Sequence, residues 1–146
     1  MTFTHRRTQA REGFTLIEIM IAVIIVGILA AAVAPLVFGY IKKARITRAK
    51  SDLRTIDSAI TLFNAGIGQF PSSLKDLIKQ PLDEKIRKKW QEASGPFLKG
   101  NEVPEDPWNN PYVYRPTPGL EHPYELFTHG PNGPGSTEGR INVWDL

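Results

Sequence analysis

The sequence predicts an α+β fold, in which one long N-terminal helix packs on a small C-terminal antiparallel sheet with short helices between them. Three observations predict this fold. Residues 19–41 carry no charge, an apolar stripe with helical spacing follows them, and turn residues alternate with short β-rich runs from Pro104 onward. The 146 residues suit one modest domain, and the absence of cysteine excludes disulfides, thiol catalysis and thiolate metal sites.

The first half of the predicted helix is a membrane segment. The 23 uncharged residues 19–41 would span about 35 Å, enough to cross a hydrocarbon core of about 30 Å. A soluble helix is rarely apolar all round for this length. At its start, Thr15 and Glu18 fit a capping box, in which Glu18 serves the first free amides of the helix. A second interpretation makes Glu18 the charge partner of another subunit, and both can hold.

The second half of the helix is amphipathic. Its apolar residues recur at steps of four and three: Ala49, Leu53, Ile56, Ile60 and Phe63. One helix therefore runs from about Leu16 to Phe63, and residues 64–66 end it. Three basic residues precede the apolar segment and five lie within residues 42–50, so the positive-inside count does not indicate a cytoplasmic N-terminus.

Two short helices are predicted next. Ser73 caps the first, which Pro81 stops, and residues 83–93 form the second with Ile86 and Trp90 on one side. The basic run Arg87-Lys88-Lys89 is interpreted as a solvated face rather than a nucleic-acid contact.

Three short antiparallel strands are predicted at residues 112–114, 124–128 and 141–144. Such a sheet cannot stand alone, so it must pack on the amphipathic half of the long helix. The aromatic residues Trp108, Tyr112 and Tyr114 are accordingly assigned to packing rather than to a ligand platform.

The sequence shows no catalytic constellation. It has no glycine-rich phosphate loop, no H-E-x-x-H and no nucleophile elbow, and the protein is predicted not to be an enzyme. His122, Glu125 and His129 could form a metal trio, but loop histidines are more often simply exposed, which argues against zinc.

Residues 13–18, Gly-Phe-Thr-Leu-Ile-Glu, resemble the class III signal of type IV pilins and pseudopilins. The resemblance implies cleavage between Gly13 and Phe14 by a prepilin peptidase, which then N-methylates Phe14. It also implies that Glu18 is the fifth mature residue and Pro35 the twenty-second, as is usual in the family. The expected parts are a leader at 1–13, a transmembrane and assembly half-helix at 14–41, and a periplasmic globular domain at 42–146 with a type IV pilin-like fold.

Further motifs narrow the resemblance to the major pseudopilin of type II secretion systems. They are residues 68–71, residues 104–114 and residues 130–133. The family usually has D-P-W-G-N-P-Y where this chain has Asn109 in place of the glycine. The implied function is that of a structural subunit of the pseudopilus, a helical periplasmic filament that helps drive folded proteins across the outer membrane.

The resemblance also implies location and partners. The chain is expected to be a single-pass protein of the bacterial inner membrane with its C-terminal domain in the periplasm. The expected partners are further copies of itself, minor pseudopilins, the inner-membrane assembly platform and the prepilin peptidase, with no nucleic acid. Two alternatives stay open, namely a type IV pilus pilin that serves adhesion or DNA uptake, and a secreted soluble domain with a discarded signal.

Three residues are assigned to assembly: Glu18, Gly27 and Pro35. In a filament, the amine of mature Phe14 would neutralise the Glu18 carboxylate of a neighbour. Pro35 cannot donate to Ala31 and glycine weakens a helix, so residues 27–35 are expected to lose helical bonds on polymerisation while the monomer stays helical.

The resemblance places calcium in the loop after the second strand, bound through carboxylates and carbonyls. By position, the ligands here would be Asn132, Ser136, Glu138 and the His129 carbonyl. Two family acids are replaced, one by Asn132 and one by Arg140. Since calcium wants six to eight oxygens with acidic charge among them, little calcium binding is expected, and no other cofactor.

The site of cleavage tests the membrane-segment interpretation. An ordinary secretory signal would be cut after Ala32 or Ala34 and would release a soluble protein. Prepilin processing would remove residues 1–13 only, because Glu18 and the stripe down to Phe63 have a purpose only when the first half-helix is retained. Intact mass and N-terminal sequencing of membrane-extracted protein should therefore show a terminus at Phe14 with one added methyl, lost when Gly13 is made bulky. A soluble product that starts at Val33 or Pro35 would contradict this.

Overall fold

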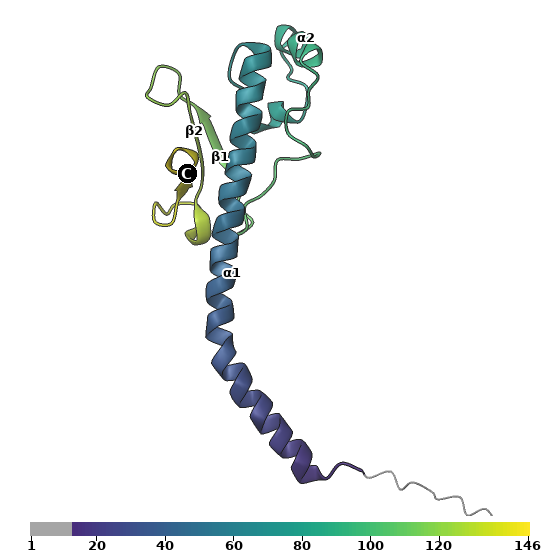
Figure 1. Cartoon of the computed structure of the whole chain (residues 1–146). Coiled ribbons are helices and arrows are strands. Elements are labelled where there is room, and N and C mark those ends of the chain that lie inside the picture. The colour runs from purple at the N-terminus through teal and green to yellow at the C-terminus, as the bar shows by residue number, and fades with distance from the viewer. Residues whose placement is uncertain (1–12) are drawn as a thin grey trace, which may run out of the picture. The chain divides into compact units, whose positions relative to one another are not determined.

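The computed structural model describes residues 13–146, apart from the side chains of residues 34–36. It has the predicted α+β class, with one long helix, short helices and a three-stranded sheet (Figure 1). In chain order the helices and strands are α1 (Leu16–Ile67), the 3-10 helix η1 (Leu74–Leu77), α2 (Glu84–Glu92), β1 (Val113–Pro116), β2 (Tyr124–Thr128), the 3-10 helix η2 (Gly130–Asn132), β3 (Ile141–Asn142) and the 3-10 helix η3 (Val143–Asp145). Two compact units divide the chain between Tyr40 and Ile41.

The first unit contains the N-terminal part of α1. Residues Leu16–Val33 are long and apolar enough to cross a membrane, and none of them is buried within the chain. Its described large apolar side chains, including Ile24 and Leu29, are exposed. No described residue of this unit covers them, and an apolar surface of this size calls for lipid or another protein to keep it from water.

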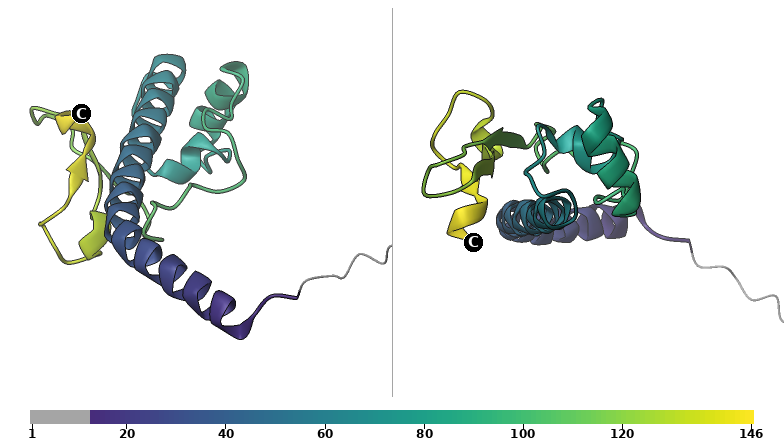
Figure 2. Two further views of the ribbon diagram at one scale, coloured as in Figure 1. Left: turned by 60° about the horizontal axis from the view of Figure 1, so that its bottom comes forward. Right: turned by 90° about the horizontal axis from the view of Figure 1, so that it is seen from above.

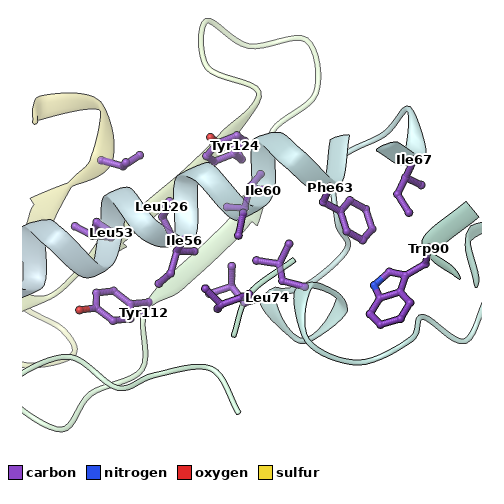
Figure 3. Close-up of a cluster of buried hydrophobic side chains, with 14 residues drawn as sticks. Leu53, Ile56, Ile60, Phe63, Ile67, Leu74, Trp90, Tyr112, Tyr124 and Leu126 are labelled. Carbon is purple, nitrogen blue, oxygen red and sulfur yellow. The ribbon is translucent and has the colours of Figure 1, made fainter. Parts of the chain in front are cut away.

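The second unit is built on the rest of α1, whose apolar stripe forms the core as predicted. Leu53, Ile56 and Ile60 are fully buried, and Phe63 is nearly so. Around them gather residues of the sheet and of the short helices, among them Leu74, Trp90, Tyr112, Tyr124 and Leu126 (Figure 3). The spacing of four and three places these residues on one face, and that face is the one that the unit buries.

The predicted end of α1 at residues 64–66 is too early. The helix continues to Ile67, and Gly68 ends it with φ +86°, donating its N–H to the Asn64 carbonyl at 2.8 Å. Gly66 lies inside the helix for a packing reason, since a Cβ there would lie only 2.8 Å from the Cβ of Ala93. Lys89 completes the end of α1 by donating from Nζ to the Ile67 carbonyl at 2.9 Å. Lys89 therefore does more than the solvated role predicted for its basic run.

Both η1, whose N-cap is Ser73 as predicted, and α2 have an acidic side chain near their start that accepts from free backbone amides. The Asp76 carboxylate accepts from the N–H groups of Ser72 and Ser73 at 2.9 and 3.0 Å, which holds the first turn of η1. Asp83 caps α2 by accepting from the N–H groups of Lys85 and Ile86. The second helix thus lies where it was predicted, and Trp90 is buried as expected.

The sheet is antiparallel in the order β1-β2-β3, with Val113 opposite Phe127 and Thr128 opposite Ile141. The prediction of a third strand through Trp144 is wrong, because β3 has only two residues. The Asn142 side chain accepts from the Trp144 N–H at 3.2 Å and turns the chain into η3. Trp144 then donates its ring N–H to the Tyr124 carbonyl at 2.9 Å.

The sheet lies on one side of the second half of α1, and η1 with α2 lies on the other (Figure 2). Two tyrosine hydroxyls fasten the sheet to polar positions of the helix beside the stripe. Tyr112 donates to the Asp52 carboxylate at 3.1 Å, and Tyr124 donates to the Asp57 carboxylate. A third, Tyr114, donates to the Pro71 carbonyl at 2.9 Å.

Burial of these tyrosines has a consequence for stability at high pH. Desolvation, reinforced by Asp52 and by Asp57 respectively, raises the pKa of Tyr112 and of Tyr124 well above the usual value near 10. Desolvation with the charge of Asp76 raises the pKa of Tyr114 to about 12. The unfolded chain therefore releases these protons before the folded chain does.

The folded protein holds these three protons to a higher pH than the unfolded chain does. We therefore predict that the free energy of unfolding falls as pH rises above about 10. Each tyrosine contributes a slope of up to about 1.4 kcal/mol per pH unit. Thermal unfolding of the processed protein in detergent, followed by near-ultraviolet circular dichroism between pH 8 and 11, measures this slope. The Tyr124→Phe variant should reduce it, with the exposed Tyr40→Phe as matched control; equal slopes in all three proteins would contradict the assignment.

Candidate functional site

The predicted cleavage point lies just ahead of α1. Gly13 and Phe14 precede the helix, and the Phe14 side chain is 80% exposed. A Cβ added to Gly13 would meet nothing within 4 Å. The chain itself therefore leaves this peptide bond accessible, and a requirement for glycine here would have to come from the enzyme that cuts it.

Glu18 makes the predicted capping box with Thr15. The Glu18 N–H donates to the Thr15 hydroxyl at 3.3 Å, and the Thr15 N–H donates to the Glu18 carboxylate at 3.4 Å. Both residues lie after Gly13, so cleavage there would leave the box intact. One carboxylate oxygen is engaged in this way at the surface of the apolar segment.

Gly27 and Pro35 lie within continuous helix. A Cβ at Gly27 would meet nothing within 4 Å, so the described chain offers no packing reason for glycine at this position. Pro35 has no N–H to donate to the Ala31 carbonyl, which weakens the helix at this turn. The segment between them is thus a helix with two weak points.

The loop after β2 brings three of the four predicted calcium ligands together. The Asn132 side-chain amide donates to the Glu138 carbonyl at 3.0 Å, and the Ser136 hydroxyl donates to the same carbonyl at 3.3 Å. The fourth, His129, has its ring Nδ1 3.4 Å from the Ser136 carbonyl. These contacts are hydrogen bonds within the loop itself, and the first two use the backbone carbonyl of Glu138 rather than its carboxylate.

Backbone contact closes the base of this loop. Gly130 has φ +70°, and a Cβ there would lie 2.2 Å from the Gly139 carbonyl oxygen, so only glycine fits. Arg140, next in the chain, places its guanidinium 3.5 Å from the centre of the Phe127 ring. The Arg140 guanidinium therefore holds a positive charge beside the loop in which the family resemblance places calcium.

The donor set does not fit a calcium site of the family type. Calcium draws its affinity from several carboxylates, and here Glu138 is the one carboxylate among the predicted ligands. Within residues 13–146, no group of three His, Asp or Glu side chains is arranged to hold a metal. The trio of His122, Glu125 and His129 does not form: His122 stacks on Trp144 at 4.3 Å and His129 meets Phe127 edge-on at 5.3 Å.

A buried carboxylate, Asp106, was not predicted from the sequence. It is 4% exposed and accepts from the N–H groups of Trp108 and Asn110 at 2.9 and 2.8 Å, and from the Thr128 hydroxyl. The Thr128 hydroxyl in turn accepts from the Gly130 N–H at 3.0 Å. Asp106 therefore ties the turn at 106–110 to the start of the loop at Gly130. One feature of the sequence could have predicted this role: Asp106 stands directly before Pro-Trp in a turn-rich stretch. In such turns a carboxylate often accepts from backbone N–H groups a few residues later in the chain.

The same turn explains Asn109. Its φ is +63°, a left-handed conformation that glycine adopts freely and that asparagine tolerates better than other side chains. This is the position at which the resembling family usually has glycine. The substitution thus preserves the turn.

Comparisons with known proteins agree with this geometry. A family described as "Type II secretion system (T2SS), protein G" matches residues 36–144, and one described as "Prokaryotic N-terminal methylation motif" matches residues 8–34. The chain belongs to the type II secretion system protein G family. A core protein G of Pseudomonas aeruginosa is 38% identical, over 96% of this chain and 98% of the relative. That of Escherichia coli K12 is 32% identical, over 97% and 96%.

A solved structure has the same fold. The major pseudopilin from the type 2 secretion system of enterohaemorrhagic Escherichia coli aligns with a TM-score of 0.56 at 24% identity, covering 75% of this chain and 94% of that one. The predicted pilin-like fold is thereby confirmed.

Family membership confirms the predicted function. The chain is a structural subunit of the type II secretion pseudopilus, and a type IV pilus pilin is not favoured. It is anchored to a membrane by its apolar helix and assembles with other components of the secretion system. The methylation motif covers Gly13, Phe14 and Glu18, which favours prepilin processing over a discarded secretory signal.

We propose that the 129–140 loop is held by its own hydrogen bonds and binds calcium weakly. Millimolar calcium, compared with a chelator, should shift the melting temperature of the processed protein by less than about 1 °C. An occupied site at about 100-fold excess over Kd would add about 2.7 kcal/mol. The double variant Asn132→Asp/Arg140→Asp restores acids at both positions and should gain a calcium-dependent shift, with magnesium as the control ion. A large shift in the unsubstituted protein, abolished by chelator, would show that the closed loop is a calcium site.

Proposed function

We propose that this subunit is cut between Gly13 and Phe14 by a prepilin peptidase and held in the bacterial inner membrane. The C-terminal domain would lie in the periplasm, and the subunit would polymerise with copies of itself. One observation carries the proposal: the apolar residues of 14–33 and 37–41 are exposed, and the whole segment 14–41 bears a single carboxylate, Glu18. Before assembly, lipid would cover this surface; in the filament, sister helices would do so.

The filament would serve transport by its growth. Each added subunit would replace lipid contacts of its apolar helix with protein contacts and lengthen a rod that pushes folded proteins toward the outer membrane. Minor pseudopilins would start or cap this rod, and an inner-membrane assembly platform would supply subunits. No catalytic activity and no nucleic acid are required of the subunit, because its work is done by assembly.

Glu18 would then have a second role beyond its capping box. Inside a bundle of apolar helices, an unpaired carboxylate is costly, and the cationic amine of mature Phe14 in a neighbouring subunit would be a chemically matched partner. Pairing with that amine would also fix the axial register of one subunit on the next. The weak helix between Gly27 and Pro35 would let the subunit lengthen while this register is kept.

Two substitutions of Glu18 separate its roles. Glu18→Ala removes both the cap and the charge, whereas Glu18→Gln keeps the capping box, which accepts either residue, and removes only the charge. We expect both variants to insert and to be cleaved at Phe14, as intact mass will show. Filament yield, measured by electron microscopy and by pelleting of sheared filaments, should fall at least about tenfold in both. Loss of one partner of a buried pair costs about 3–5 kcal/mol, and 1.4 kcal/mol is already tenfold.

A normal yield in Glu18→Gln with a reduced yield in Glu18→Ala would assign Glu18 to capping alone. Thr15→Ala is the matched control, because it weakens the cap and keeps the charge.

A further inference from the structure

Five basic residues follow the apolar segment without an acid among them. We call residues 42–50 the basic collar; its charged members are Lys42, Lys43, Arg45, Arg48 and Lys50. All are exposed except Lys50, which is half-buried. The first acid after the collar is Asp52.

The collar is not neutralised by its own unit. Arg48 is the one member with an ion pair in the described part of the chain, at 3.7 Å from Asp52, and Asp52 also accepts from the Tyr112 hydroxyl. The remainder of the unit, residues 51–146, has 10 basic and 13 acidic residues and a net charge of −3. The net positive charge of this unit therefore comes from nine residues at its N-terminal end.

Chain connectivity places the collar at a membrane surface. Lys42 directly follows the uncharged run that ends at Ile41, and the collar continues in α1 at a rise of about 1.5 Å per residue. All its charges thus lie within about 14 Å of the end of the apolar run, and the headgroup layer occupies about 5–8 Å of this length on each side. Lysine and arginine side chains reach several ångströms further along the surface.

We propose that the basic collar binds the phosphate groups of anionic phospholipids where the apolar segment leaves the bilayer. A lysine or arginine held at an anionic membrane surface strengthens binding about fivefold. Lys42, Lys43 and Arg45 are the members closest to the bilayer, and their exposed side chains point to different sides of one helical turn. The collar would thus gather several lipid headgroups around the helix.

Topology signals do not account for these charges. If the domain lies in the periplasm, five basic residues on the exported flank oppose the positive-inside tendency. A binding role on that side gives a reason for charges that hinder insertion. The topology comparison rests on the proposed orientation, whereas binding to anionic lipid requires only that the collar adjoin the bilayer.

The test uses the processed full-length protein reconstituted in phosphatidylcholine bilayers with a trace of spin-labelled phosphatidylglycerol or spin-labelled phosphatidylcholine. Electron spin resonance gives the fraction of each label immobilised at the protein. We expect the preference for phosphatidylglycerol to be severalfold at about 0.05 M NaCl and to approach one at about 0.5 M, as screening shortens the Debye length. This salt response requires no variant.

Two triple variants localise the preference. The preference for phosphatidylglycerol should fall at least about threefold in the collar variant Lys42→Gln/Lys43→Gln/Arg45→Gln. The control variant Lys85→Gln/Arg87→Gln/Lys88→Gln also removes three positive charges, but from exposed positions of α2, and should leave the preference unchanged. Melting curves of both variants verify the fold. Retention of the preference in the collar variant, or equal loss in both, would overturn the proposal.

Two further measurements test whether the collar binds another anionic partner instead. If the unsubstituted protein shows no preference for phosphatidylglycerol, yet inorganic phosphate stabilises it in detergent and does not stabilise the collar variant, the collar binds free phosphate and not the lipid surface. If the unsubstituted protein shows no lipid preference, and the collar variant instead loses chemical cross-links between copies, the collar binds the acidic part of a second copy. Either result rejects the proposal, and neither depends on the assembly yields that test Glu18.

Discussion

The structure depends on an apolar surface that the chain cannot bury by itself. The first half of α1 exposes its large side chains on all sides, whereas the core draws on α1 only from Ala49 onward. Adjacent segments of one helix therefore require different surroundings: the first half needs lipid or other helices, and the second half already has a core. Membrane anchoring and polymerisation are two ways to satisfy the same requirement, which is why one sequence serves both.

The features that could be predicted from the sequence are those set by periodicity or by local chemistry. The stripe from Leu53 to Phe63, the helix at residues 83–93 and the box at Thr15 each depend on residues a few positions apart. Contacts between distant segments decided the rest. Ala93 lies so close to Gly66 that a larger residue would clash there, and Lys89 of α2 donates to the Ile67 carbonyl at the end of α1. Trp144 leaves the strand direction and donates its ring N–H to the Tyr124 carbonyl.

The residues of the candidate site likewise divide into those that local sequence predicts and those that depend on distant contacts. Gly13, Phe14 and Glu18 lie within six consecutive residues of a local motif, so the sequence alone could single them out. Asp106 escaped prediction because its value lies in joining residues 106–110 to Thr128, which no spacing reveals. In the 129–140 loop the residues converge as expected, but their hydrogen bonds close the loop on itself. Whether that loop binds a cation therefore depends on the charges of its side chains, and not on whether the predicted residues lie together.

The charges at the two ends of the apolar run have opposite sign and complementary consequences. Glu18 lies at its start and the basic collar at its end, with 23 uncharged residues between them. A carboxylate in lipid is tolerable at an interface and costly deeper in, while lysines and arginines prefer the anionic surface, so the pair would hold the segment at one depth. On leaving the bilayer, the carboxylate would need a cationic partner, and the collar would exchange lipid phosphates for other anions. If both proposed contacts form, extraction is most favourable where a growing filament supplies both partners at once.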